Sequence, residues 1–66
     1  MKILLNGVNK DVNTGITLKA LIEQEGLAAK RLAAEVNGEI ISKAEHGHTM
    51  LNESDKIEIV HAIGGG

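Results

Sequence analysis

The sequence contains no cysteine and no Phe, Trp or Tyr, and each absence excludes a class of structure or function. Without cysteine there is no disulfide scaffold, no thiolate zinc site, no cysteine nucleophile and no persulfide carried on a side chain. Without aromatic residues, the side chains on which nucleic-acid bases stack are missing. The core must be built from Leu, Ile, Val and Ala, and roughly a dozen large aliphatic side chains, at about 1.5–3 kcal/mol each, can hold a small fold.

Charge and length narrow the possibilities further. The sequence has seven Lys and Arg residues and nine Asp and Glu residues, which gives a net charge of −2. The basic residues are scattered along the sequence, so the basic cluster typical of a nucleic-acid-binding surface is lacking. The longest apolar run is far shorter than the roughly 20 residues of a membrane helix, and the first residues follow a strand pattern rather than that of a signal peptide. With 66 residues, we expect one globular cytoplasmic domain with no nucleic-acid or membrane partner.

The N-terminal segment has the pattern of a β-hairpin. A strand over residues 2–5 is followed by Asn6-Gly7, the dipeptide best suited to a tight turn, and a second strand is expected over residues 9–13. Because side chains alternate along a strand, Leu4 is placed on the sheet face opposite the core.

A short amphipathic helix is expected next. It begins after Thr17, and its apolar stripe has the spacing i, i+3, i+4 at Leu18, Leu21 and Ile22. Gly26 ends it, since glycine can take the left-handed conformation of a helix C-terminus, and Leu27 can then fold back onto Ile22.

The second half of the chain is predicted to be mostly extended. A strand over 32–36, a tight turn at Asn37-Gly38 and a strand over 39–41 are followed by an irregular segment, 42–48, with room for one helical turn. A short strand near 49–51 and a polar turn over 52–55 precede the last strand, in which Ile57 and Ile59 alternate with Glu58.

One helix and several strands, in the order β β α β β β, favour an α+β fold in which the helix covers one sheet face. We therefore predict a β-grasp domain over residues 1–63, with a mixed sheet of about five strands, and a flexible glycine tail over 64–66. The residues expected to form the core are Ile3, Leu5, Leu21, Ile22, Val36, Ile57 and Ile59.

The sequence ends on three glycines directly after the apolar run 57–63. Glycine has no Cβ, so Gly64, Gly65 and Gly66 form a thin strip that can enter a narrow channel and present the α-carboxylate of Gly66. The alternative interpretation is a frayed or artificial end with no function.

Three groups of residues carry a resemblance to a known family: Met1-Lys2-Ile3 with Leu5-Asn6-Gly7, then Asn37-Gly38-Glu39-Ile40, and the final segment Asp55-Lys56-Ile57-Glu58-Ile59-Val60-His61-Ala62-Ile63-Gly64-Gly65-Gly66. Over essentially the whole chain, the sequence resembles the ThiS family of ubiquitin-like sulfur carriers of thiamine biosynthesis. It departs from the family pattern at Ser54, where glycine is frequent, and at Ser42, where proline is common.

The resemblance implies that Gly66 is the only covalent participant that this chain supplies. A ThiF-like enzyme would adenylate its carboxylate with ATP, a sulfur donor protein would convert the adenylate into a thiocarboxylate, and a ThiG-like thiazole synthase would use that sulfur. Gly64 and Gly65 would thread the tail into these partners. The chain would then be a protein substrate that binds no cofactor, not an enzyme.

A partner surface and three histidines complete the candidates. Leu4 and Val60 are apolar residues whose side chains are predicted to point away from the core, on two strands that lie side by side in this fold. Together with Ile63, they are expected to contact the adenylating enzyme. His46, His48 and His61 are too generically spaced to indicate a metal site, and we interpret them as solvent-exposed or partner-facing.

Two other functions stay open at this point. The small subunit of molybdopterin synthase resembles the same fold and ends in the same Gly-Gly, although the short chain and the lack of aromatic residues argue against it. A non-covalent ubiquitin-like interaction module with an inert tail is the alternative from another class.

Overall fold

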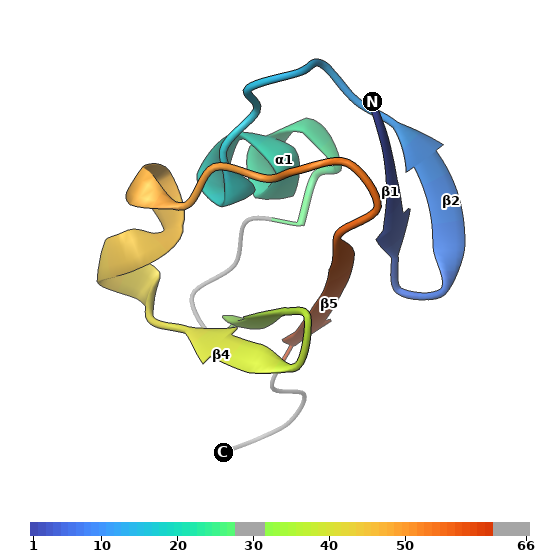
Figure 1. Cartoon of the computed structure of the whole chain (residues 1–66). Coiled ribbons are helices and arrows are strands. Elements are labelled where there is room, and N and C mark those ends of the chain that lie inside the picture. The colour runs from blue at the N-terminus through green and yellow to red at the C-terminus, as the bar shows by residue number, and fades with distance from the viewer. Residues whose placement is uncertain (28–31, 62–66) are drawn as a thin grey trace.

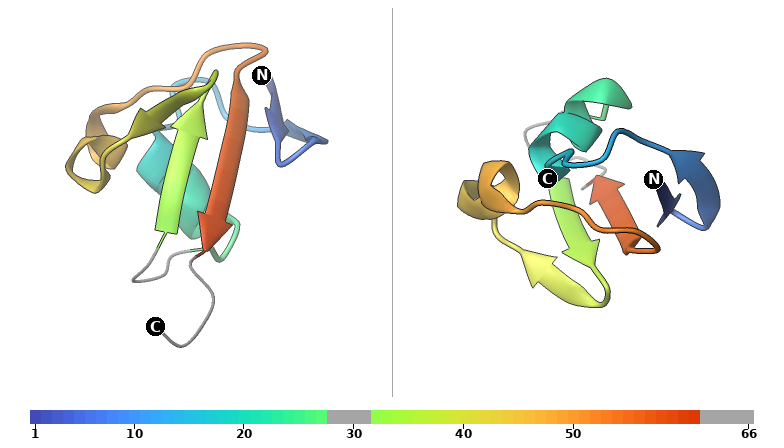
Figure 2. Two further views of the ribbon diagram at one scale, coloured as in Figure 1. Left: turned by 90° about the horizontal axis from the view of Figure 1, so that it is seen from below. Right: turned by 45° about the horizontal axis from the view of Figure 1, so that its top comes forward.

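A computed structural model of the protein describes residues 1–27 and 32–61. The predicted tail at Gly64–Gly66, the boundary before it, and Ile63 lie outside the described residues. Within them, the chain forms one five-stranded mixed sheet, and helix α1 (Leu18–Gln24) packs on one of its faces (Figures 1 and 2). The predicted β-grasp architecture is confirmed.

The sheet has the strand order β2-β1-β5-β3-β4, so the last strand along the chain lies in its middle. Strand β5 runs parallel to β1 and antiparallel to β3, while each hairpin pair is antiparallel. The strands are β1 (Lys2–Leu5), β2 (Val8–Asp11), β3 (Leu32–Val36), β4 (Glu39–Ile41) and β5 (Lys56–His61).

Both predicted Asn-Gly turns close hairpins. Asn6 and Gly7 have φ angles of 49° and 81°, and Asn37 and Gly38 have 52° and 85°. Positive φ at both central residues is what a two-residue hairpin turn needs to match the twist of its strands, and Asn and Gly tolerate it best.

Helix α1 begins and ends where the sequence predicts. The Oγ1 atom of Thr17 accepts a hydrogen bond from the backbone N–H of Ala20 at 3.1 Å, which caps the first turn. At the other end Gly26 has a φ of 69°, and the N–H of Leu27 donates to the carbonyl of Ile22 at 2.9 Å. Leu27 packs against the core, which completes the expected C-terminal motif.

The core contains six of the seven predicted residues. Val36 is the exception, because it lies at the turn end of β3 and is only partly buried, while Ala34, in the middle of that strand, is fully buried. The prediction also missed Leu51, which is 2% exposed. The buried apolar residues are Ile3, Leu5, Val12, Leu18, Leu21, Ile22, Ala34, Leu51, Ile57 and Ile59.

The segment between β4 and β5 differs from the prediction. Residues Lys43–His48 form a 3₁₀ helix, η1, and the strand expected near 49–51 is reduced to one isolated bridge between Met50 and Thr17. The N–H of Leu51 donates to the carbonyl of Ile16 at 3.0 Å, so this segment pairs with the loop before α1 and not with the sheet. That pairing places the Leu51 side chain in the core.

Ser54 and Ser42, which stand where the resemblance predicts glycine and proline, adopt backbone conformations that suit glycine and proline. Ser54 has a φ of 70°, the left-handed region that glycine enters freely and that costs other L-residues roughly 1–2 kcal/mol. Ser42 has a φ of −65°, the angle at which proline is fixed. In the described part of the chain, no helix has the length and apolarity needed to span a membrane.

Candidate functional site

The described part of the site is β5, the strand that leads into the glycine residues. It lies between β1 and β3, so backbone hydrogen bonds hold it from both sides. Gly64, Gly65 and Gly66, the predicted reactive tail, follow outside the described residues. The structure therefore positions the end of β5, Val60 and His61, which is here called the root of the tail.

The asparagines of the two hairpin turns also hold β5. The backbone N–H of Ile59 donates to Oδ1 of Asn6 at 2.8 Å, and that of Lys56 donates to Oδ1 of Asn37 at 2.9 Å. From the sequence, both residues are predicted only as turn formers, because nothing local shows that their side chains reach a strand distant in sequence. Each asparagine thus joins a turn to the strand that precedes the tail.

Asp55 fixes the start of β5. Its side chain accepts a hydrogen bond from the backbone N–H of Asn52 at 2.7 Å and another from Nδ2 of Asn37 at 3.0 Å. The residue is 9% exposed, so these bonds form in a largely dry environment, where an unpaired carboxylate would be costly.

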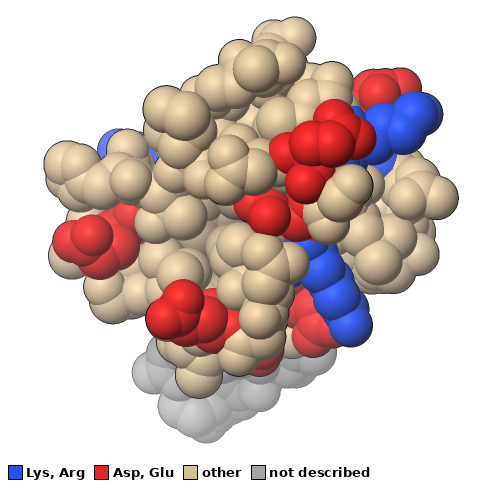
Figure 3. Space-filling model, viewed as in Figure 1, with Lys and Arg blue, Asp and Glu red and all other residues tan. Residues whose placement is uncertain are grey.

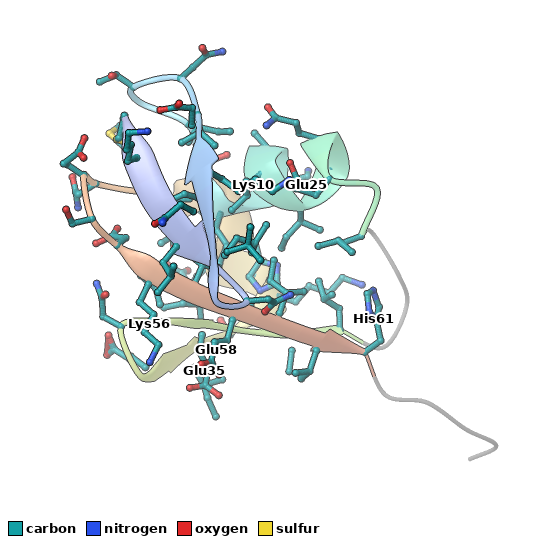
Figure 4. All side chains as sticks on the ribbon, turned by 90° about the vertical axis from the view of Figure 1, so that its right-hand side faces the viewer. Lys10, Glu25, Glu35, Lys56, Glu58 and His61 are labelled. Atoms are coloured by element: carbon teal, nitrogen blue, oxygen red, sulfur yellow. The ribbon has the colours of Figure 1, made fainter. Side chains whose placement is uncertain are left out.

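His61 is the last described residue of β5. Its Nε2 atom lies 2.9 Å from the backbone carbonyl of Leu27, just after α1. Because a carbonyl oxygen only accepts, Nε2 is the protonated nitrogen that donates. Figure 4 shows His61 at the end of β5, directly before the undescribed residues. The imidazole thus joins the root of the tail to the helical side of the domain.

The other two histidines differ from each other. His46 was expected to be exposed, but this is wrong: it is 5% exposed, and its Nε2 atom donates to the carbonyl of Ile41 at 3.1 Å. This hydrogen bond from η1 to the end of β4 satisfies the buried Nε2 atom, and the spacing of the histidines in the sequence does not reveal it. His48 is exposed. Among residues 1–27 and 32–61, no three His, Asp or Glu side chains gather as metal ligands would.

The predicted partner residues lie on the sheet face away from α1, here called the outer face. Val60 is 58% exposed, whereas Leu4 is half-buried. Leu4 is in register with Lys56, and Val60 lies four residues farther along β5, about 13 Å away at 3.3 Å per residue. The two side chains therefore do not form one continuous patch. Their part in partner binding stays a prediction, and Ile63 lies outside the described residues.

The outer face contains a pair of glutamates that the sequence pattern does not predict as a site. Glu35 of β3 is directly opposite Glu58 of β5, and with Gly38 and Lys56 they line a hollow of about 140 Å³ (Figure 4). Nζ of Lys56 lies 4.0 Å from Oε1 of Glu58. Alternation along each strand indicates that both glutamates point outward, but their opposition depends on the β3–β5 register, which the sequence does not show.

Comparisons with known proteins agree with this architecture. The chain is 42% identical, over its full length, to a thiazole synthase of Magnetococcus marinus and 36% identical to one of Paramagnetospirillum magneticum. It spans about a fifth of the length of each of these relatives, 20% in both cases. The crystal structure of the thiamine biosynthesis protein ThiS from Geobacter metallireducens matches with a TM-score of 0.87 and 25% identity, and the match covers 100% of both chains.

The family model whose description is "ThiS family" matches residues 3–66, which is almost the whole sequence. This match includes the hairpins, β5 and the three glycines that follow it. The chain therefore belongs to the ThiS family.

Proposed function

We propose that this chain is a sulfur carrier of thiamine biosynthesis and that its sulfur is carried as a thiocarboxylate on Gly66. The observation that carries this proposal is the family match, which continues through β5 to Gly66. The thiamine biosynthesis protein whose structure matches end to end supports the same role.

The chemistry requires activation by a partner. A carboxylate is a poor electrophile because its negative charge repels nucleophiles, so the adenylating enzyme would join the Gly66 carboxylate to AMP from ATP and release pyrophosphate. A donor that delivers sulfur at the oxidation level of sulfide would then attack the acyl carbon. The new C–S bond would replace the C–O bond to the phosphate, AMP would leave, and Gly66 would end in a thiocarboxylate. Sulfur carried in this way needs no thiol side chain, which is consistent with a sequence that contains no cysteine.

In this proposal the chain is a protein substrate with two enzyme partners, one that adenylates it and a thiazole synthase that takes its sulfur. The two relatives named thiazole synthase support the second partner, since a region equivalent to the whole chain makes up a fifth of each. ATP is bound by the adenylating partner and not by this chain.

The root of the tail sets the distance over which the tail can act. Five residues follow His61 in the sequence, and an extended segment of that length spans at most about 16–18 Å. A partner whose active site receives Gly66 must therefore contact the domain close to the end of β5. This geometry makes the outer face beside Val60 a suitable contact surface.

ATP–pyrophosphate exchange tests the proposal. The purified chain is incubated with a ThiF-like adenylating enzyme, ATP and labelled pyrophosphate, and label in ATP reports reversible adenylation. We expect exchange that depends on the chain. Exchange that is the same with and without the chain would contradict the proposed function.

A further inference from the structure

The outer face combines like charges and exposed apolar side chains in an arrangement that folding alone does not favour. Glu35 and Glu58 are directly opposite each other in an antiparallel pair, where like charges destabilise a sheet. Ile40 is in register with Glu35 on the other side and is 73% exposed, the largest exposure of any large apolar residue among those described. These residues, together with Val60, are here called the acidic patch.

The acidic patch is continuous across three strands. Strand register places Ile40 of β4, Glu35 of β3 and Glu58 of β5 side by side in one row. Val60 lies one position farther along the same face of β5, opposite Ala33. Two carboxylates thus lie at the centre, and one exposed β-branched side chain lies at either end.

The local cation neutralises this pair only in part. Lys56 reaches Glu58 at 4.0 Å, with side-chain exposures of 60% and 50%, so the contact is long and well solvated. Such a pair contributes little and is readily exchanged. No ion pair with Glu35 is found among the described residues. Figure 3 shows one face of the molecule, on which acidic side chains form several separate groups and only some of these groups have a basic side chain beside them.

The chemistry of the acidic patch excludes several occupants. A second copy of the chain related by a two-fold axis would bring its own Glu35 and Glu58 against this pair, and an anionic lipid surface or a nucleic acid would be repelled. A hard divalent cation prefers six or more oxygen ligands or retained waters, and here only two carboxylates meet beside a lysine. A cationic side chain fits better, and arginine best, because its planar fork can donate to both carboxylates.

We propose that the acidic patch docks a surface of the adenylating enzyme on which an arginine lies between apolar residues. The guanidinium would enter the hollow that Glu35 and Glu58 line together with Gly38 and Lys56, and it would replace the long, solvated contact of Lys56 with Glu58. The apolar neighbours of the arginine would cover Ile40 and Val60. This inference rests on the proposed function and adds to it the kind of surface that the partner presents. Val60 lies in the second-last described position before the tail, so an enzyme bound here is close to its root.

Neutral, isosteric variants test this docking. In the double variant Glu35→Gln/Glu58→Gln, the shape is kept and both charges are removed. We expect the KM for the carrier in ATP–pyrophosphate exchange to rise about tenfold with kcat unchanged, as for loss of charge-assisted contacts made equally before and during the reaction. The dependence of kcat/KM on salt should also become weaker, since steering by the patch is lost.

The matched control removes two charges elsewhere. Glu23 on α1 and Glu45 on η1 are exposed, so Glu23→Gln/Glu45→Gln has the same net charge but leaves the acidic patch intact. It should retain the wild-type KM and salt dependence. The urea midpoint of the Glu35→Gln/Glu58→Gln variant should be equal to or above that of the wild type, because a like-charge pair has been removed.

Two results would overturn the inference, and they can be told apart. If the wild type supports exchange and Glu35→Gln/Glu58→Gln matches it in KM and salt dependence, the acidic patch does not dock the enzyme and the proposed function stands. If the control variant loses as much as the patch variant, the effect comes from net charge and the patch is not a specific site. A wild-type chain that supports no exchange contradicts the proposed function itself.

Discussion

Along β5, the side chains alternate between two very different environments. Ile57 and Ile59 point towards α1 and are 0% and 5% exposed, whereas Val60 on the outer face is 58% exposed and the side chain of Glu58 is 50% exposed. The inner face is apolar and covered, while the outer face mixes carboxylates with exposed aliphatic side chains. One strand thus contributes to stability on one side and carries the proposed contact surface on the other, and it ends three positions before the first glycine of the tail.

The largest loss of stability is expected when a side chain that packs against the inner face of the sheet is shortened. Leu21 of α1 is fully buried against the sheet, so Leu21→Ala should lower the free energy of unfolding by about 2–5 kcal/mol. For a domain of this size that is much of its total stability, and urea unfolding should show a far lower midpoint. An unchanged midpoint would mean that the inner face does not hold the fold.

The second-largest loss of stability is expected on replacing Asp55, the buried polar residue immediately before β5. Asp55→Ala leaves the backbone N–H of Asn52 and the amide of Asn37 without their acceptor. We expect a loss of about 1–3 kcal/mol in the free energy of unfolding, measured by urea titration at neutral pH. A loss as large as that of Leu21→Ala would show that polar bonds at the sheet end matter as much as the inner face.

The ion pair between β2 and α1 should have a smaller, pH-dependent effect. Nζ of Lys10 lies 2.8 Å from Oε1 of Glu25, and the hydrogen bond from Lys10 lowers the pKa of Glu25 below its ordinary value (Figure 4). A lowered pKa means that the pair stabilises the fold above the unfolded-state pKa and that this contribution is lost as pH falls from about 5 through the folded-state pKa.

The variant Glu25→Gln isolates this contribution. Its midpoint in urea should fall less steeply than that of the wild type as the pH is lowered through the carboxylate range. Parallel pH profiles for the two proteins would show that Glu25 does not link β2 to the helix energetically.

The smallest effect on stability is expected on the outer face. Val60→Asp should lower the free energy of unfolding by no more than about 1 kcal/mol, because the side chain is already in solvent and only the low strand propensity of Asp and its repulsion from Glu58 act against the fold. Binding of the adenylating enzyme should nevertheless weaken, since a charge replaces an apolar contact. A much lower urea midpoint for the variant would contradict the proposal that the outer face adds little to stability. Exchange kinetics equal to those of the wild type would contradict the proposal that this face binds the enzyme.

Much of the fold could be predicted from the sequence because its signals are local. Asn-Gly pairs specify the hairpin turns, Thr17 and Gly26 bound the helix, and alternation assigns the two faces of β5. The segment around Leu51 could not be predicted in this way. Its strand-like pattern reflects burial against the loop before α1, and that contact depends on the tertiary arrangement.

The candidate site was harder to predict for the same reason. The glycines and the family resemblance lead to the prediction of Gly66 as the carrier site without any structure. In contrast, the side-chain bonds of Asn6 to β5 and the opposition of Glu35 and Glu58 arise only when strands distant in sequence are in register. Burial of His46 likewise depends on how η1 packs.

The most direct test of the central claim is the intact mass of the chain after reaction with the adenylating enzyme, ATP and a sulfur donor. We predict a mass gain equal to replacement of one oxygen by sulfur, located at Gly66 by fragmentation. A control chain with one alanine added after Gly66, which moves the carboxylate by about 3.3–3.6 Å, should not gain this mass. Equal sulfur incorporation in both chains, or none in the wild type, would contradict the account of Gly66 as the carrier site.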